Sequence, residues 1–496
     1  MPAEPGGTDP GSRSAGHATT GALGSEKLGL LGVLMPGLAQ IAPAFNLFFT
    51  TGLMASLAGP SVPLIFLISM IGMVATGLSL AQFASLYPSA GSFVTYIGRA
   101  IGPEVATAVG VITLIGYIIA FGGIYIFVGS YIVDNVIGGP HVPGLVQLVT
   151  LLFGVLVTVP VIVGLQVGIR ATVALYLFEV VVLLLLGLVI LVRGGAQGLS
   201  LRPFTWPAGA DTGSVFRAFS LAVLAFGGFE ASAPLAEETR DPRRNVPLAV
   251  VGSVVISGLL YVFGSYAIVT AFGPDQMKRF AADPNPFATA ARTYLPLLTP
   301  VIAWVFLSSV TSSYVAANTQ ASRVIFGGAR GGLWPSVLAR VSPRFQTPWV
   351  AVTVFVVPSL LIAVISTAFT DPGTAAGFLG TLGILGPVVM YIVTNIALIV
   401  QYVKLRRSGQ SRSAVWWVVT PVIGLLVLAI PVWGDLRPGQ DAPYNALPWL
   451  TLGLIALGVV YTMILARRQP GVMAQAPALL EGAESTDEVA STRRAG

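Results

Sequence analysis

The stretch Ala171–Val192 reads ATVALYLFEVVVLLLLGLVILV and contains a single charged residue, Glu179. Its length is close to the roughly 20 residues that an α-helix needs to cross the hydrocarbon core of a bilayer. Only helices and closed barrels satisfy every backbone polar group inside a membrane. Because the apolar residues follow one another without the strict alternation of a barrel strand, the stretch predicts a transmembrane α-helix.

The whole chain has this character. Of its 496 residues, 55% are hydrophobic and 9% are charged, and its mean hydropathy is +0.84. A soluble domain usually contains about 25% charged residues. Hydropathy therefore predicts an all-α membrane protein with about twelve transmembrane helices. We expect them near residues 28–57, 62–86, 104–136, 143–165, 171–192, 214–236, 247–272, 295–325, 348–369, 374–402, 414–433 and 447–466.

These helices form two sets of five and a final pair, between two polar tails. The sets cover about 28–193 and about 214–403, which together make a predicted core of residues 28–403, and the last two helices lie within 414–466. Residues 1–27 and 470–496 are polar and poor in apolar residues. Such composition predicts disordered tails.

The basic residues predict that both tails lie in the cytoplasm. Threading twelve helices with the N-terminus inside places seven basic residues outside, and the other nineteen of the twenty-six inside. This excess agrees with the positive-inside rule. The seven are Arg193, Arg202, Arg217, Lys278, Arg279, Arg292 and Arg437.

Several classes of protein are disfavoured by composition. The chain has no cysteine, and its only histidines are His17 and His141, so we expect no disulfide, no metal site and no haem or other cofactor. The pI is about 9.6, but topology explains the basic residues, and we expect no nucleic-acid partner. A membrane enzyme would need clustered His, Asp or Glu near one interface, and the sequence shows no such cluster.

Two predicted helices contain residues that interrupt a helix. The first contains Pro36-Gly37 and then Pro43, and the sixth contains Gly227-Gly228. Proline removes a backbone donor, and glycine costs about 1 kcal/mol inside a helix. Because each break falls in the first helix of a five-helix set, the pair indicates a transporter-type binding site at the freed backbone groups. Ordinary kinks at packing positions are the alternative.

Four motifs resemble the amino acid–polyamine–organocation transporter superfamily. Tyr87–Ser92, followed by Tyr96, Arg99, Gly102 and Pro103, is similar to the family segment P-S-A-G-G-x-Y-x-Y…G-P. Phe226–Glu230 resembles its F-x-G-F-E break, and Glu237–Pro247 resembles its E-E-x-x-x-P-x-R-x-I-P loop. Ser322-Arg323 with Ala329–Pro335 resembles the loop after the eighth helix. The resemblance extends from about Leu28 to Val403.

This resemblance implies a five-plus-five inverted repeat with the first and sixth helices broken, followed by two C-terminal helices. It also implies a central substrate site between the two breaks. The expected substrate-binding residues are Ala42, Pro43, Ala44, Phe45, Phe226, Gly227, Gly228 and Phe229. Exposed helix-terminal N–H groups favour a carboxylate and exposed carbonyls accept from an ammonium, so this site suits an amino acid.

The chain departs from the family pattern at two positions. Pro43-Ala44-Phe45 stands where many members have Gly-Ser/Thr-Gly, and proline offers no N–H to a carboxylate. Leu224 stands where arginine–agmatine exchangers have tryptophan, which argues against an arginine exchanger.

Four polar residues are candidates for coupling transport to an ion. Glu179 and Glu230 lie within predicted membrane helices, where ionisable groups are usually functional and burial disfavours the charged form. Each can instead be structural, Glu179 in a hydrogen bond between helices and Glu230 as a cap on freed N–H groups. Ser312 and Ser313 are candidates for sodium coordination, although hydroxyls mostly serve helix packing.

The sequence thus predicts a secondary active transporter for amino acids or related amines in the cytoplasmic membrane. It is expected to work by alternating access and to couple to protons rather than sodium. An amino acid/amine exchanger and a polyamine permease are the alternatives. From another class, a membrane sensor that binds amino acids without moving them fits the same residues.

Overall fold

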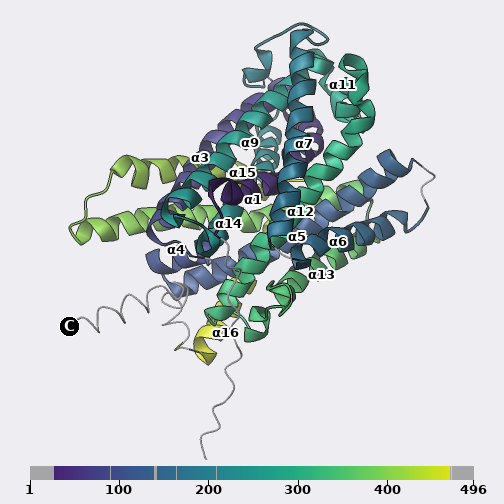
Figure 1. The fold of residues 1–496 in the computed structure, drawn as a ribbon. Helices are drawn as coiled ribbons and strands as arrows, with labels where there is room; N and C mark the ends of the chain where they lie inside the picture. The colour runs from purple at the N-terminus through teal and green to yellow at the C-terminus, as the bar shows by residue number, and fades with distance from the viewer. Residues whose placement is uncertain are drawn as a thin grey trace, which may run out of the picture.

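The computed structural model describes residues 27–89, 91–138, 142–163, 165–207, 209–469 and 471. The described part is built of helices (Figure 1). The two predicted tails lie outside the described residues, apart from Lys27 and Gly471. Ala90 and His141 are likewise outside them.

Eleven helical stretches of the described part are long and apolar enough to cross a membrane. The first, Leu30–Leu86, has 57 residues, which is the length of two crossings. The prediction of about twelve transmembrane helices is therefore confirmed. They are α1 (Leu30–Ile41) with α2 (Pro43–Ala58), α3 (Val62–Leu86), α5 (Pro103–Ile132), α6 (Leu145–Val163), α7 (Leu165–Val192), α8 (Thr212–Phe226) with the 3₁₀ helix η4 (Phe229–Glu238), α9 (Pro242–Phe272), α12 (Thr299–Arg330), α13 (Trp349–Ser366), α14 (Pro372–Arg407), α15 (Thr420–Leu436) and α16 (Leu447–Arg468).

Three short α-helices of the described part were not predicted. They are α4 (Ser92–Ala100), α10 (Met277–Ala282) and α11 (Pro286–Tyr294). Each is far shorter than the roughly 19-residue window on which hydropathy analysis depends. They lie in the connections between spans, so they do not change the number of crossings.

Both predicted breaks are present. Helix α1 ends at Ile41, and Ala42 adopts a left-handed conformation with φ 48° before Pro43 begins α2. Helix α8 ends at Phe226, and Gly228 has φ 108° before the chain continues as η4. A side chain is strained at such φ values, and glycine is not. Proline and glycine therefore stop these helices in mid-membrane, as their chemistry predicts.

Glycines bring α5 and α14 into close contact at the centre of the molecule. A Cβ atom added at Gly116 would lie 2.6 Å from the Gly383 carbonyl oxygen, and one at Gly383 would lie 2.2 Å from the Ala120 nitrogen. Small residues are how membrane helices approach closely without a hydrophobic driving force between them. This contact fixes α14 against α5, and both helices line the site described below.

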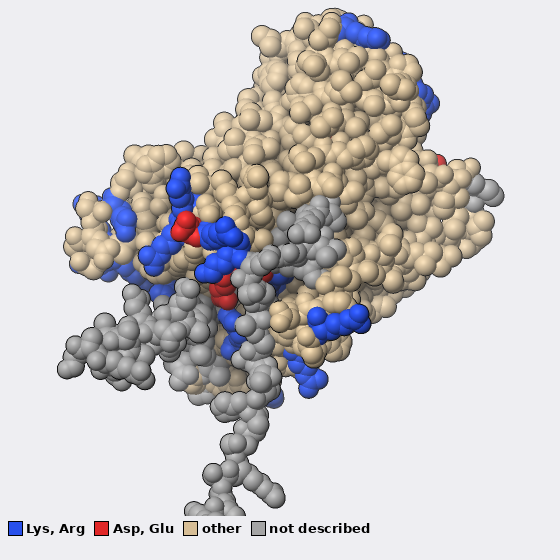
Figure 2. All heavy atoms as spheres, viewed as in Figure 1, with Lys and Arg blue, Asp and Glu red and all other residues tan. Residues whose placement is uncertain are grey.

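The outer surface of the helices is apolar, and the charges lie at the ends. Leu152, Val155 and Leu156 on α6 are all exposed, as expected for side chains that face lipid. Figure 2 shows the Lys and Arg side chains of this face gathered at the end of the molecule that contains α4 and α16, with few near α11. This separation agrees with the predicted topology, whose orientation in the cell remains a prediction.

Candidate functional site

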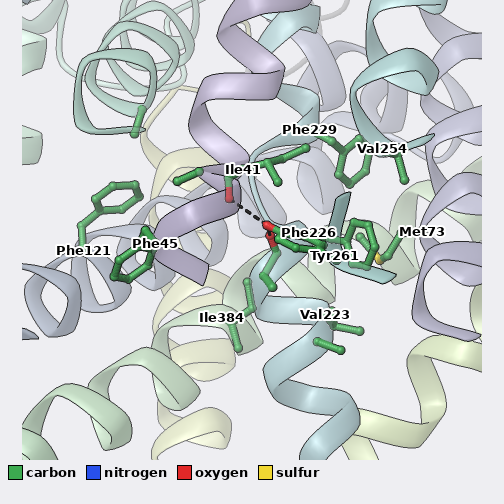
Figure 3. Close-up of a cluster of buried hydrophobic side chains, with 14 of the residues drawn as sticks. Ile41, Phe45, Met73, Phe121, Val223, Phe226, Phe229, Val254, Tyr261 and Ile384 are labelled. Atoms are coloured by element: carbon green, nitrogen blue, oxygen red, sulfur yellow. Dashed lines mark hydrogen bonds between the residues drawn. The ribbon is translucent and has the colours of Figure 1, made fainter. Parts of the chain in front are cut away.

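The carbonyls freed at the two breaks share the same two partners. Asn46 Nδ2 donates to the Ile41 carbonyl at 2.6 Å, and the Tyr261 hydroxyl lies 2.9 Å from the same oxygen (Figure 3). At the second break, the Ala225 carbonyl lies 2.6 Å from the Tyr261 hydroxyl and 3.4 Å from Asn46 Nδ2. Asn46 on α2 and Tyr261 on α9 therefore join the two broken helices.

We predict that Tyr261→Phe lowers the stability of the protein by about 1–3 kcal/mol, because it leaves buried carbonyls short of a donor. The midpoint of thermal unfolding in detergent should fall. Tyr266→Phe on the same helix is the matched control, since that hydroxyl donates to the Ser200 carbonyl of a loop at 3.1 Å. A Tyr261→Phe protein that unfolds at the wild-type temperature would show that Asn46 alone satisfies both breaks.

Glu230, at the start of η4, is fully buried in a network of donors. The hydroxyls of Tyr117 and Tyr391 donate to its carboxylate, the latter at 2.9 Å. Gln320 Nε2 donates at 3.4 Å, and the Gly228 backbone N–H at 3.2 Å. Four donors from α5, α12, α14 and the second break thus converge on this side chain. This arrangement agrees with the predicted capping role. Tyr117 also lines the cavity described below, so it connects the Glu230 carboxylate to that cavity.

Glu179 on α7 has the opposite environment. Its side chain is fully buried, and in the described part of the chain no donor makes a well-formed hydrogen bond to either carboxylate oxygen. The Ala44 backbone N–H and the Ser309 hydroxyl face it, and that hydroxyl accepts from the Phe45 N–H at 3.0 Å. Glu179 therefore lies at the N-terminal end of α2, where the helix dipole favours negative charge.

The two serines predicted as ion ligands donate to backbone carbonyls. Ser312 donates to Ser309 at 2.8 Å, and Ser313 to Gln40 at 2.9 Å. Ser313 also lines the central cavity. The serine hydroxyl that faces Glu179 is that of Ser309, which was not singled out from the sequence.

A cavity of about 40 Å³ lies beside the breaks. This volume holds about three water molecules, so a substrate must displace side chains to enter. Its polar lining consists of Gln40, Asn46, Tyr117 and Ser313. The rest is apolar, namely Phe45, Phe49, Ala120, Phe121, Ile124, Phe127, Leu224, Gly227, Ala376, Gly380 and Ile384.

Of the eight predicted substrate-binding residues, Phe45 and Gly227 line this cavity. Phe226 instead packs edge-on against Tyr261, with ring centroids 5.2 Å apart, and Phe229 lies 5.2 Å from the Tyr391 ring. Figure 3 shows Phe45 and Phe121 on the opposite side of the break from Phe226 and Tyr261. Other lining residues, such as Gln40 and Tyr117, could have been predicted from the sequence because they are polar residues inside apolar helices.

Backbone hydrogen bonds join the segment before α1 to the end of η4. The Leu28 N–H donates to the Glu238 carbonyl at 2.7 Å, and the Arg240 N–H donates to the Leu28 carbonyl at 2.9 Å. Arg323 of α12 forms a buried ion pair with Glu238 at 2.7 Å. The family-like loop Glu237–Pro247 and the Ser322-Arg323 motif therefore meet at this end of both broken helices.

Comparison with known proteins agrees with this arrangement. The model of the family described as amino acid permease matches residues 32–464. The low-affinity putrescine importer PlaP of Escherichia coli is 27% identical over 449 residues, which cover 87% of this chain and 93% of that protein. The branched-chain amino acid permease BcaP of Bacillus subtilis is 26% identical, over 86% of this chain and 91% of that protein. The human large neutral amino acids transporter small subunit 2 is 34% identical over 164 residues, 32% of this chain and 29% of that protein. The chain therefore belongs to the amino acid permease family and is a multi-pass membrane transporter.

Proposed function

We propose that the protein moves an amino acid with an apolar side chain across the cytoplasmic membrane by alternating access, coupled to protons. The observation that supports an amino acid as the substrate is the unsatisfied amide oxygen of Gln40. Its Oε1 is buried and accepts no hydrogen bond from the described residues, and the residue lines the cavity. A buried acceptor without a partner is unfavourable, and a substrate ammonium would satisfy it.

The apolar wall of the cavity suits the substrate side chain. The rings of Phe45 and Phe127 lie 5.9 Å apart, and the Phe121 ring lies 5.2 Å from that of Tyr314. Burial of an aliphatic side chain against such rings contributes roughly 25 cal/mol per Å². Similarity to a branched-chain amino acid permease supports the same substrate class.

An amine is the second candidate, because the N–H groups at the breaks are engaged. Phe45 donates to Ser309, and Gly228 donates to Glu230. A substrate carboxylate would have to displace these acceptors, whereas an amine without a carboxylate would not. Similarity to a putrescine importer supports this candidate.

For coupling, Glu179 is the leading group and Glu230 its rival. Glu179 faces the Ala44 N–H at the N-terminus of α2, so a proton there changes the charge directly at the first break. Glu230 already accepts from two tyrosines, which suits a fixed role at the site.

A counterflow screen in proteoliposomes tests the substrate class. Vesicles that contain the purified chain are loaded with one unlabelled compound, and uptake of its labelled form is measured. We expect counterflow with branched-chain or other apolar amino acids. Counterflow with putrescine alone would favour the amine, and binding without counterflow would identify a sensor.

We predict that both termini are cytoplasmic, from the asymmetry of basic residues. The native chain has no cysteine, so single cysteines report position cleanly. An impermeant thiol reagent added outside cells should label Lys278→Cys, in the predicted outer connection, and not Ser408→Cys. Both positions are exposed on the protein surface. The reverse labelling pattern would invert the topology.

A further inference from the structure

A second cavity lies between the half-helices α2 and α8 and the helices α14 and α15. Its volume is about 110 Å³, against about 40 Å³ for the central cavity. Ser56, Arg217, Ser220, Thr381, Asp435 and Tyr444 supply its polar lining. Arg217 and Tyr444 line this cavity, and the predicted topology places both on the outer side of the membrane. We therefore place the cavity toward the outside.

Two opposite charges line this cavity without pairing. Asp435 on α15 is 3% exposed, and no ion pair joins it to Arg217 in the described part of the chain. The Arg217 guanidinium instead lies over the Tyr444 ring, 4.8 Å from its centroid. The other arginine nearby, Arg437, pairs with Asp211 at 3.4 Å.

The stabilising neighbours of the Asp435 carboxylate are the Ser220 hydroxyl and the positive charge of Arg217. The Ser220 hydroxyl lies beside it, but donates to the Pro431 carbonyl at 3.3 Å. Gln440 Nε2 donates to the Asp435 backbone carbonyl at 2.6 Å rather than to the carboxylate. A buried carboxylate is unfavourable without a paired cation or several hydrogen-bond donors. The Asp435 side chain can therefore accept hydrogen bonds from a cationic group of a ligand.

We propose that this cavity is a second binding site for a zwitterionic amino acid, in which Asp435 binds the ammonium and Arg217 the carboxylate. Guanidinium and carboxylate form strong paired hydrogen bonds. A diamine would bring a second cation toward Arg217, and a simple anion would meet Asp435. Only a ligand with both charges matches both groups. This inference rests on the proposed function, in that the ligand is the amino acid that the chain transports.

Helix α14 allows the two cavities to be filled separately. Gly380 lines the central cavity, and a Cβ atom there would meet only Leu224 Cδ2, at 3.8 Å. Gly377 lines the second cavity, and a Cβ atom there would lie 3.1 Å from the Tyr444 hydroxyl. Gly380→Leu and Gly377→Leu are therefore a matched pair of cavity-filling variants on one helix.

The test is the number of labelled amino acid molecules bound per purified full-length chain, using an amino acid that the wild type transports. We expect two for the wild type, and one for each of Asp435→Asn, Arg217→Gln, Gly377→Leu and Gly380→Leu. Asp441→Asn, at an exposed acid three residues before Tyr444, is the control and should bind two.

One molecule bound per wild-type chain, lost in Gly380→Leu and unchanged in affinity in Asp435→Asn, would overturn the second site alone. The wild-type count decides this even if a variant fails to fold. Absence of transport of every amino acid would instead reject the proposed function.

Discussion

Glu179→Gln is expected to abolish accumulation of substrate driven by a pH gradient while substrate exchange continues. The glutamine mimics a permanently protonated side chain, so the α2 end of the first break no longer changes charge during the cycle. A gradient of one pH unit supports up to about tenfold accumulation per coupled proton. In the variant this ratio should fall to about one. Labelled uptake into proteoliposomes measures both activities.

Two further substitutions make the result specific. Glu230→Gln should reduce substrate affinity and exchange together, because it replaces the carboxylate that accepts hydrogen bonds from Tyr117 and Tyr391. Glu104→Gln, at an exposed position at the start of α5, should change neither activity. Accumulation against a gradient by the Glu179→Gln protein would show that Glu179 is structural.

Gly228→Leu is expected to reduce the affinity of the central cavity for substrate at least tenfold. A Cβ atom at this position would lie 2.5 Å from Cγ of Gln40, the side chain proposed to accept from the substrate ammonium. The backbone there has φ 108°, which strains any side chain. Equilibrium binding of labelled substrate measures the loss.

Because that strain can also disturb the fold, Gly380→Leu provides a second test at an ordinary helical position. It fills the central cavity without a close contact and should also block binding in that cavity. Gly453→Leu is the control, since a Cβ atom there meets nothing within 4 Å. Wild-type affinity in a transport-competent Gly228→Leu or Gly380→Leu protein would move the substrate away from this cavity.

The fold was largely predictable because a membrane demands long apolar helices with all backbone groups satisfied. Stretches such as Ala171–Val192 meet that demand from local sequence alone. The breaks were predictable for a similar reason, since Pro43 and Gly227-Gly228 act on their own backbone. The inverted repeat itself stays a prediction, because apolar helices resemble one another in sequence.

The site was less predictable, because its contacts join distant segments. Tyr261 reaches Ile41 across 220 positions, and Tyr391 reaches Glu230 across 161. Periodicity within one helix says nothing about which residue of another helix it meets. Glu179 and Glu230 were found because charge inside a membrane is rare. The tyrosines and amides that surround the breaks carry a weaker signal, because uncharged polar residues also occur at ordinary contacts between membrane helices.

The most direct test of proton-coupled transport at this site uses the wild-type chain in proteoliposomes with an acidic exterior and no sodium. The account predicts that labelled apolar amino acid accumulates above its external concentration, and that a protonophore returns it to equilibrium. Accumulation that instead requires a sodium gradient, and ignores the pH gradient, would contradict the account and make Ser312 and Ser313 the residues to test.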